Sequence, residues 1–254
     1  MKIVVPVKLV PDLVEELTID PSGTALDTSW LRLIINEFDD HAIEQAILLK
    51  ERSSGHVTII TLDAEEVDDM LFAAAAKGAD KLIKLVGNFE SVINNHALAR
   101  ALVPLVQDLQ PDLILTGVQS HNDLDGSLGA LLAEYLHMPY VGYVSGVSAE
   151  PGRAIAHKEY PGGLTAKIGI NLPAVLGIQA AEQPPRYVAI SKVRQMMKTA
   201  QIDEHEVSSV DSSGGARITR MYQPEVAERA TMITGDANET SDKLIVIFQE
   251  LGVL

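Results

Sequence analysis

The sequence contains no cysteine. Disulfide bonds, thiolate catalysis, Fe–S clusters and cysteine-based zinc sites are therefore excluded. Aromatic residues are scarce, at 4% of the chain, with a single tryptophan, Trp30, which we interpret as a packing anchor. The seven histidines are scattered and form no HxH or HExxH pattern, so we expect no metal site. No nucleophile or acid/base pair is evident either, and we expect no catalytic residues.

Basic residues are also few. Lys and Arg number 20 against 35 Asp and Glu, which gives a formal net charge of −15 in 254 residues. A surface of this sign repels nucleic-acid backbones and anionic membranes, and no apolar run is long enough to span a bilayer. We therefore expect no nucleic-acid binding and no membrane insertion. The sequence opens without the features of a secretory signal, which predicts a cytoplasmic protein.

Apolar segments of two different periods alternate along residues 1–147. Short runs rich in Val and Ile predict buried strands, and segments with apolar residues three and four apart predict helices. The predicted strands are 2–8, 57–62, 81–86, 112–116 and 140–147, and the predicted helices are 39–53, 65–77, 91–109 and 127–136. This order predicts an α/β fold, in which a mostly parallel sheet carries helices on both faces.

The pattern changes after residue 148. Three short segments predict strands of an antiparallel extension, at 154–159, 164–170 and 173–179. A helix is predicted at 188–198. Residues 203–238 are polar and predict an extended arm with little core of its own, while 241–251 predicts an amphipathic helix that docks on another surface. We therefore expect a nucleotide-binding α/β domain at 1–200 and, at 201–254, a C-terminal arm and helix that dock on a partner.

A glycine-rich loop follows one predicted strand and opens the next predicted helix. Gly117, Gly126 and Gly129 permit tight turns and close approach of the backbone. Free N–H groups at the start of the helix would suit a phosphate. Asp125 or Ser127 could instead cap that helix. Because no strict GxGxxG or Walker pattern is present, the loop alone leaves phosphate binding and a simple capped turn as equal alternatives.

Other chain segments should meet this loop. In a parallel sheet, ligands bind beyond the carboxyl ends of the strands, near the point where the strand order reverses. Residues 6–8 and 62–64 follow two of the predicted strands. Just before the first predicted helix, Asn36 could bind an adenine edge. For Asp39, an N-cap of that helix is the favoured interpretation.

The sequence resembles the beta subunit of electron transfer flavoproteins along its whole length. The likeness begins with KIVVPVK at 2–8 and continues with INEFD at 35–39, which precedes an Ala/Glu/Leu helix. AAAAKGAD at 73–80 is similar to the family's A-L-A-M-G-A-D, and 117–129 is similar to its G-[RK]-Q-A-x-D-x-D-x-x-Q-x-G loop. This loop departs from the family at Ser127 and Leu128, where the family has Gln-Thr or Gln-Val, which shortens or removes side-chain donors at the phosphate end.

The resemblance implies a Rossmann-like fold of the adenine nucleotide alpha hydrolase-like type, and an electron carrier rather than an enzyme. It implies AMP, or a second FAD, in this chain. It also implies an alpha-type subunit, with which the chain shares a redox FAD and carries electrons from a dehydrogenase to an acceptor. The cofactor-binding residues that it implies are Pro6, Asn36, Glu37, Phe38, Asp39, Leu62, Gly117, Val118, Gln119, Ser120, His121, Asn122, Asp123, Leu124, Asp125, Gly126, Ser127 and Leu128. The implied partner-docking residues are Arg186, Tyr187 and Ile190.

The alternative is a stand-alone adenine-nucleotide-binding protein of related fold, which could form a homodimer. The C-terminal arm favours the heterodimer, because an arm that ends in an amphipathic helix can dock on a partner subunit. Even as a heterodimer subunit, the chain on its own could pair with itself.

Overall fold

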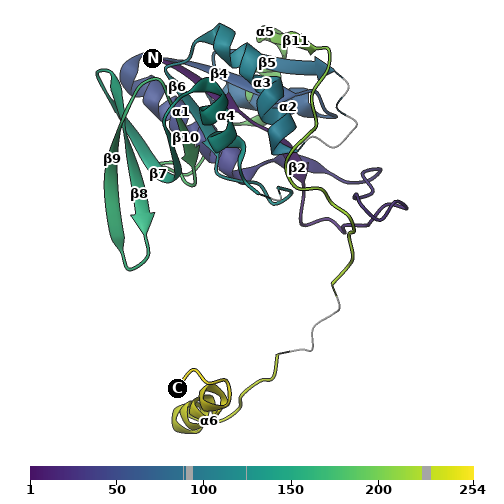
Figure 1. The fold of residues 1–254 in the computed structure, drawn as a ribbon, viewed down its shortest axis with the longest axis vertical. Coiled ribbons are helices and arrows are strands. Elements are labelled where there is room, and N and C mark those ends of the chain that lie inside the picture. Colours follow the sequence, from purple (N-terminus) through teal and green to yellow (C-terminus); the bar gives the residue numbers. More distant parts are fainter. Residues whose placement is uncertain (88, 90–93, 124, 225–229) are drawn as a thin grey trace.

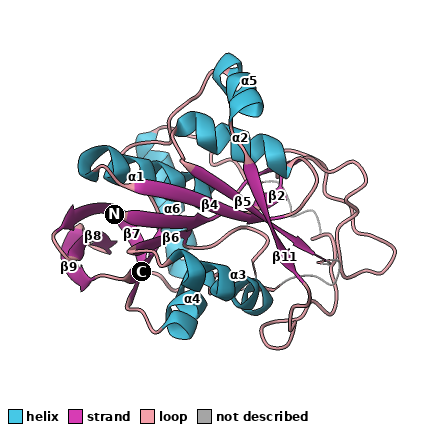
Figure 2. Ribbon diagram, turned by 90° about the horizontal axis from the view of Figure 1, so that it is seen from above, coloured by secondary structure: helices cyan, strands magenta, loops and turns pink. Residues whose placement is uncertain are grey.

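The computed structural model describes residues 1–254 except 88, 90–93, 124 and 225–229. Within the described residues, nine strands form one sheet between two layers of helices, and two short strands pair in a separate antiparallel sheet (Figure 1, Figure 2). The strands are β1 (Lys2–Pro6), β2 (Leu9–Pro11), β3 (Leu33–Ile35), β4 (His56–Leu62), β5 (Lys81–Gly87), β6 (Leu113–Gly117), β7 (Tyr140–Glu150), β8 (Arg153–Tyr160), β9 (Leu164–Asn171), β10 (Ala174–Ile178) and β11 (Ile202–Val207). The helices are α1 (Glu37–Ser53), α2 (Val67–Lys77), α3 (Asn95–Leu109), α4 (Leu128–Leu136), α5 (Ile190–Thr199) and α6 (Ala237–Glu250).

The order of the large sheet is β11-β5-β4-β1-β6-β10-β7-β8-β9. Every pairing from β11 to β7 is parallel, and β8 and β9 extend the sheet in the antiparallel sense. The predicted α/β fold is therefore confirmed.

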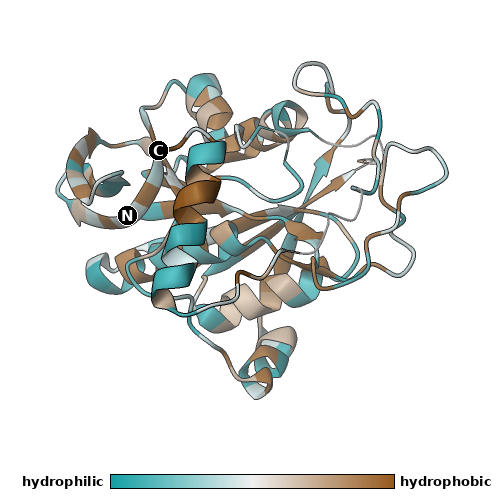
Figure 3. Ribbon diagram, turned by 90° about the horizontal axis from the view of Figure 1, so that it is seen from below, coloured by the Kyte–Doolittle hydropathy of each residue, from teal (hydrophilic) through white to brown (hydrophobic). Residues whose placement is uncertain are grey.

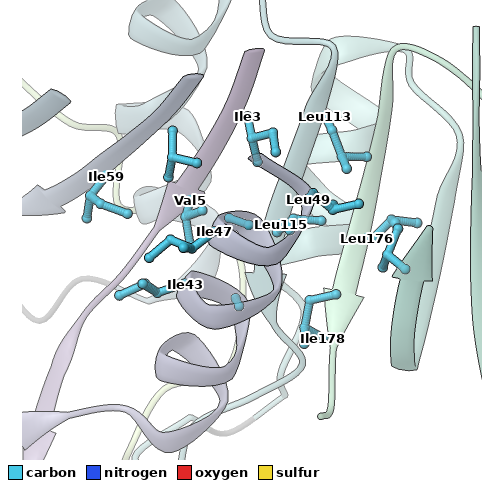
Figure 4. Close-up of a cluster of buried hydrophobic side chains, with 14 of the residues drawn as sticks. Ile3, Val5, Ile43, Ile47, Leu49, Ile59, Leu113, Leu115, Leu176 and Ile178 are labelled. Atoms are coloured by element: carbon cyan, nitrogen blue, oxygen red, sulfur yellow. The ribbon is translucent and has the colours of Figure 1, made fainter. Parts of the chain in front are cut away.

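Two apolar cores lie on opposite faces of the sheet. Alternate residues of a strand point to opposite faces, so Ile3 and Val5 of β1 join the core under α1 and α2 (Figure 4), whereas Val4 joins the core under α3 and α4. Ile43 and Ile47 of α1 are almost fully buried against the first face. Each such side chain contributes about 1.5–3 kcal/mol of burial free energy. Because β1 is packed between these two cores, the position of its carboxyl end at the edge of the sheet is fixed.

One predicted strand takes a different place in the sheet from the one expected. Residues 173–179 were expected in the antiparallel extension, but β10 lies in the parallel part of the sheet, between β6 and β7. All of β10 is buried, and its run of apolar residues is typical of a strand covered on both faces. Only β8 and β9 run antiparallel to their neighbours in the large sheet.

The polar arm also starts later than expected. Residues 202–207 form β11, an edge strand parallel to β5. Its charged side chains face solvent and pair with lysines of β5, as in Lys81–Asp203 at 3.1 Å and Lys84–Glu204 at 3.6 Å. An edge strand needs little apolar surface and is often charged, which is why composition alone concealed it.

Helix α3 begins at Asn95, later than the predicted start. The Asn94 side chain caps it by accepting a hydrogen bond from Ala97 N at 2.9 Å. The predicted first turn falls on 91–93, which lie outside the described residues.

The segment between β2 and β3 is exposed and stands out from the body. The chain turns at residues 20–23, where Gly23 N donates to Asp20 O at 3.0 Å. Trp30 at the far end of this segment is 95% exposed, so our interpretation of it as a packing anchor is wrong. The arm crosses here, where Met221 N donates to Gly23 O at 2.7 Å.

Helix α6 lies apart from the rest of the chain, at the end of the arm (Figure 1). Asp236 caps it, accepting hydrogen bonds from Asn238 N and Glu239 N at 2.9 Å. None of its residues is buried, and apolar residues are concentrated in its middle (Figure 3). Across the described chain, no helix combines the length and the apolar character needed to cross a membrane.

Candidate functional site

A narrow hollow opens where β1, β4 and β6 end. It lies at the carboxyl edge of the sheet, beside the start of α1, with α3 forming part of its wall. Seven of the residues implied by the resemblance line it, namely Pro6, Asn36, Asp39, Leu62, Gly117, Gln119 and Leu128. The remaining lining residues are Val7, Lys8, Ile60, Thr61, Leu98 and Leu102. The hollow is thus apolar on the side of β4 and α3 and polar where β1, α1 and β6 meet.

Asp39 joins the ends of two neighbouring strands. One carboxylate oxygen accepts a hydrogen bond from Lys8 N at 3.0 Å, and the other accepts from Gly117 N at 3.1 Å. Burial raises the pKa of Asp39 to about 6, although the charge of Lys8 and the hydrogen bonds to the carboxylate act in the opposite direction. The expected N-cap role is wrong, because Asn36 holds the cap position and Asp39 lies in the first turn of α1. Asp39 instead positions the floor of the hollow.

Asn36 connects this floor to the glycine-rich loop. Its backbone N–H donates to Lys8 O at 3.0 Å, and its side-chain Nδ2 donates to Gln119 O at 3.0 Å. The residue is buried. The side-chain amide N–H is therefore already engaged with backbone, and it aligns the loop that follows β6.

Gly117 has no room for a side chain. A Cβ there would lie 2.4 Å from Asp39 Oδ1 and 2.9 Å from the Cβ of Phe38. A larger residue would push α1 away from the end of β6. The glycine is therefore needed for the close approach on which the Asp39 hydrogen bonds depend.

The loop of residues 118–127 is held by its own side chains. Ser120 N donates to Asp123 Oδ2 at 3.1 Å, and Ser120 Oγ donates to Asn122 Oδ1 at 2.6 Å. At the start of α4, Asp125 Oδ1 accepts from Ser127 N at 3.2 Å and from Ser127 Oγ at 2.9 Å. Gly126 provides the turn between them, with φ of 58°.

Asp125 also reaches α3. Its Oδ1 accepts from Asn95 Nδ2 at 2.6 Å. Partial burial acts to raise the pKa of Asp125, but the hydrogen bonds from Asn95 and Ser127 outweigh it, and the pKa is lowered. Ser127 occupies the N-cap position of α4 without a side-chain cap bond. The expected capping of α4 by Asp125 or Ser127 is therefore not made by a side chain, and Asp125 instead closes the turn just before the helix by accepting from Ser127.

The other implied residues surround the hollow without lining it. Val118 and Ser120 are buried, whereas Glu37, His121 and Asn122 are exposed. Leu124 lies outside the described residues. Phe38, Asp123, Asp125, Gly126 and Ser127 shape the neighbouring turns.

Lys8 was not among the implied residues, yet it lines the hollow. Its Nζ forms an ion pair with Asp123 Oδ1 in the loop that follows β6. A basic residue directly after a buried strand, at the edge where ligands bind, was the available signal. Among the described residues, no group of three or more His, Asp or Glu lies close enough to hold a metal ion.

The three docking residues divide into an anchor and an exposed pair. Arg186 is fastened to α1, where its guanidinium contacts Glu44 at 2.8 Å and Glu51 at 2.6 Å. The hydrogen bonds and charges of these two carboxylates raise the pKa of Arg186 well above its usual range. Tyr187 is 87% exposed, and Ile190, the first residue of α5, is 65% exposed. Arg186 therefore holds the start of this segment against α1, while Tyr187 and Ile190 face solvent.

Comparison with known proteins gives one consistent family. Residues 25–210 match the family model described as electron transfer flavoprotein domain. The electron transfer flavoprotein subunit beta of Methylophilus methylotrophus is 32% identical over 98% of both chains. That of Thermoanaerobacterium thermosaccharolyticum is 27% identical over 96% of both chains. The caffeyl-CoA reductase-Etf complex subunit CarD of Acetobacterium woodii is 26% identical over the whole of both chains. With this coverage and with the fold described above, the chain belongs to the electron transfer flavoprotein family and is related along its length to the beta subunits.

Proposed function

We propose that this chain is the beta-type subunit of a heterodimeric electron carrier. It holds an AMP, or a second FAD, in the hollow beyond β1, β4 and β6, and it shares a redox FAD with an alpha-type subunit. The heterodimer carries electrons from a dehydrogenase to an acceptor, and the chain itself has no catalytic residue. The bound FAD supplies the redox chemistry, while the protein provides position and electrostatics.

The hollow supports the adenine nucleotide. It lies beyond the carboxyl ends of parallel strands, where α/β folds bind nucleotides. Gly117 lets β6 end close against α1, and Asn36 and Asp39 hold the floor of the hollow. Leu98, Leu102 and Leu62 provide an apolar wall suited to a flat base.

The observation that carries the heterodimer is the unburied face of α6. Leu244, Ile247, Phe248 and Leu251 recur at helical spacing on one side, with exposed fractions between 36% and 69%. An isolated helix of 14 residues is marginal in water, so its apolar face needs another surface. An alpha-type subunit, reached by the arm, is that surface.

The test is co-expression with an alpha-type subunit. We expect a yellow one-to-one complex in size-exclusion chromatography, with the absorption bands of oxidised flavin, and a chain without reducible flavin when it is expressed alone. Denaturing the chain should release AMP near one per molecule, as measured by anion-exchange chromatography. A chain that alone carries stoichiometric, dithionite-reducible flavin and passes electrons onward would overturn the proposal. A colourless homodimer with bound AMP that ignores the alpha-type subunit would establish the stand-alone alternative.

A further inference from the structure

Lys8, which lines the hollow, forms an ion pair with a carboxylate of the same chain, that of Asp123. Its Nζ contacts Asp123 Oδ1, and the side chains of Lys8 and Asp123 are 24% and 10% exposed. Asp123 is itself fixed, because its Oδ2 accepts from Ser120 N at 3.1 Å and its own N–H donates to Ser120 O at 3.0 Å. The ion pair therefore links the end of β1 to the turn that follows β6.

Lys8 is the only cationic residue lining the hollow within the described part of the chain. Asp39 lies beside it, so this small region already contains two carboxylates for one lysine. Just before α4, the backbone N–H of Ser127 also donates to Asp125. A phosphate that enters here therefore meets donors that the chain's own carboxylates already occupy.

We propose that Lys8 recognises the phosphate of the bound nucleotide by exchanging Asp123 for it. This inference rests on the proposed function and deepens it by naming the residue that binds the charged phosphate of the ligand. In the exchange, Lys8 keeps one anionic partner throughout, and the Asp123 carboxylate is released to the solvent at the opening. Asp123 is thus an internal competitor that limits how strongly the site prefers a phosphorylated ligand over its nucleoside.

Two substitutions act on this preference in opposite directions. Asp123→Asn removes the competing charge but keeps an oxygen that can accept from Ser120 N, so the turn should persist. Lys8→Met keeps an unbranched side chain of similar length but removes the cation, which leaves the phosphate facing Asp123 and Asp39. The backbone N–H of residue 8, which donates to Asp39, is unaffected. Both changes should act on the phosphate more than on the nucleoside.

The experiment measures the affinity of the full-length chain, freed of endogenous nucleotide, for AMP and for adenosine by equilibrium dialysis. We expect the ratio of the two affinities to rise about tenfold in favour of AMP in Asp123→Asn, and to fall about tenfold in Lys8→Met, with each tenfold change corresponding to about 1.4 kcal/mol. Asp203→Asn is the matched control, because it removes a lysine-paired aspartate on β11, and it should leave the ratio unchanged.

The outcomes separate this inference from the proposed function. If AMP and adenosine bind but both variants keep the wild-type ratio, Lys8 does not read the phosphate, and the nucleotide pocket stands without the exchange. If neither ligand binds to any form of the protein, the pocket assignment fails and the exchange fails with it. If Lys8→Met also loses adenosine, the residue is needed for folding, and the ratio in Asp123→Asn decides.

Discussion

At the scale of single residues, one buried carboxylate holds the candidate site together. Asp39 accepts hydrogen bonds from Lys8 N and Gly117 N, which stand at the ends of β1 and β6. Two backbone N–H groups that would otherwise lack partners at the edge of the sheet are satisfied in this way, and each would cost about 1–3 kcal/mol if left unpaired in a buried position. The charge that satisfies them has a cost of its own, since burial disfavours the ionised form.

That cost should appear as a pH dependence of stability. Burial raises the pKa of Asp39 from 3.8 to about 6, so the folded protein binds this proton more tightly than the unfolded chain does. Stability from this residue therefore increases as the pH falls from about 6 toward 4, by about 2 kcal/mol. We expect the unfolding free energy of the wild type, measured with urea at pH 7 to 4, to rise by that amount relative to Asp39→Asn. Other carboxylates titrate equally in both proteins, so parallel curves would contradict the raised pKa.

Gly126 provides a second prediction at this scale. Its φ is 58°, and a Cβ there would lie 3.0 Å from the Cβ of Gln119. Gly126→Val should therefore distort the loop beside the hollow and reduce the AMP released per chain at least tenfold, or about 1.4 kcal/mol. Gly162→Val, at the tip of the β8–β9 hairpin with φ of 80° and no atom within 4 Å of its Cβ, carries similar backbone strain and should retain the nucleotide. Full nucleotide content in Gly126→Val would exclude this loop from the site.

At the scale of elements, α5 presents an apolar residue where a helix begins. Arg186 ties the preceding segment to Glu44 and Glu51 on α1, so the position of Ile190 is set although the side chain itself is exposed. An exposed aliphatic side chain whose backbone is held in place can act as a small binding hot spot when it enters a pocket of a partner.

Ile190→Ala should therefore slow electron transfer with the physiological dehydrogenase about tenfold, or about 1.4 kcal/mol. Because the side chain is 65% exposed, the melting temperature and the nucleotide content should hardly change. Met197→Ala, at the other end of α5 and 49% exposed, is the control and should transfer electrons at the wild-type rate. A fall of several degrees in the melting temperature of Ile190→Ala would point to a role in folding instead.

At the scale of the whole molecule, the chain consists of a packed α/β body and helix α6, which does not pack against that body. The body buries its apolar residues in two cores, while α6 keeps its apolar face exposed beyond the arm. Stability of the body and assembly with a partner should therefore be separable.

Deleting residues 237–254 should leave the melting temperature of the isolated chain unchanged and weaken its complex with an alpha-type subunit. The apolar stripe has about four large side chains, so the loss could reach several kcal/mol. Phe248→Asp should weaken the complex in the same direction, whereas Asp242→Asn, on the same helix, should not. Equal affinities of the full-length and truncated chains in analytical ultracentrifugation would show that α6 does not bind the partner.

How far the sequence predicted the fold depends on how local each signal is. Within residues 1–136, the helices and the strands of the large sheet could be predicted because their periods arise within a few residues, whereas the short strands β2 and β3 were not predicted. β11 could not, because IDEHEV has no apolar run, and only the free edge of β5 makes it a strand. The partners in the sheet could not be read either, since β10 lies beside β6 although many residues separate them in the chain.

The features of the candidate site likewise differ in whether neighbouring residues or distant contacts produce them. The amino-acid sequence alone predicts that a glycine-rich loop follows a buried strand, that Asn36 and Asp39 lie at the start of a helix, and that the arm carries an amphipathic helix, because each of these is a pattern in neighbouring residues. The packed fold is what makes Asp39 join two strand ends instead of capping a helix, and what brings Lys8 to Asp123. Those contacts depend on the strand order and on backbone distances of a few ångströms, which the whole packed sheet sets and no short segment encodes.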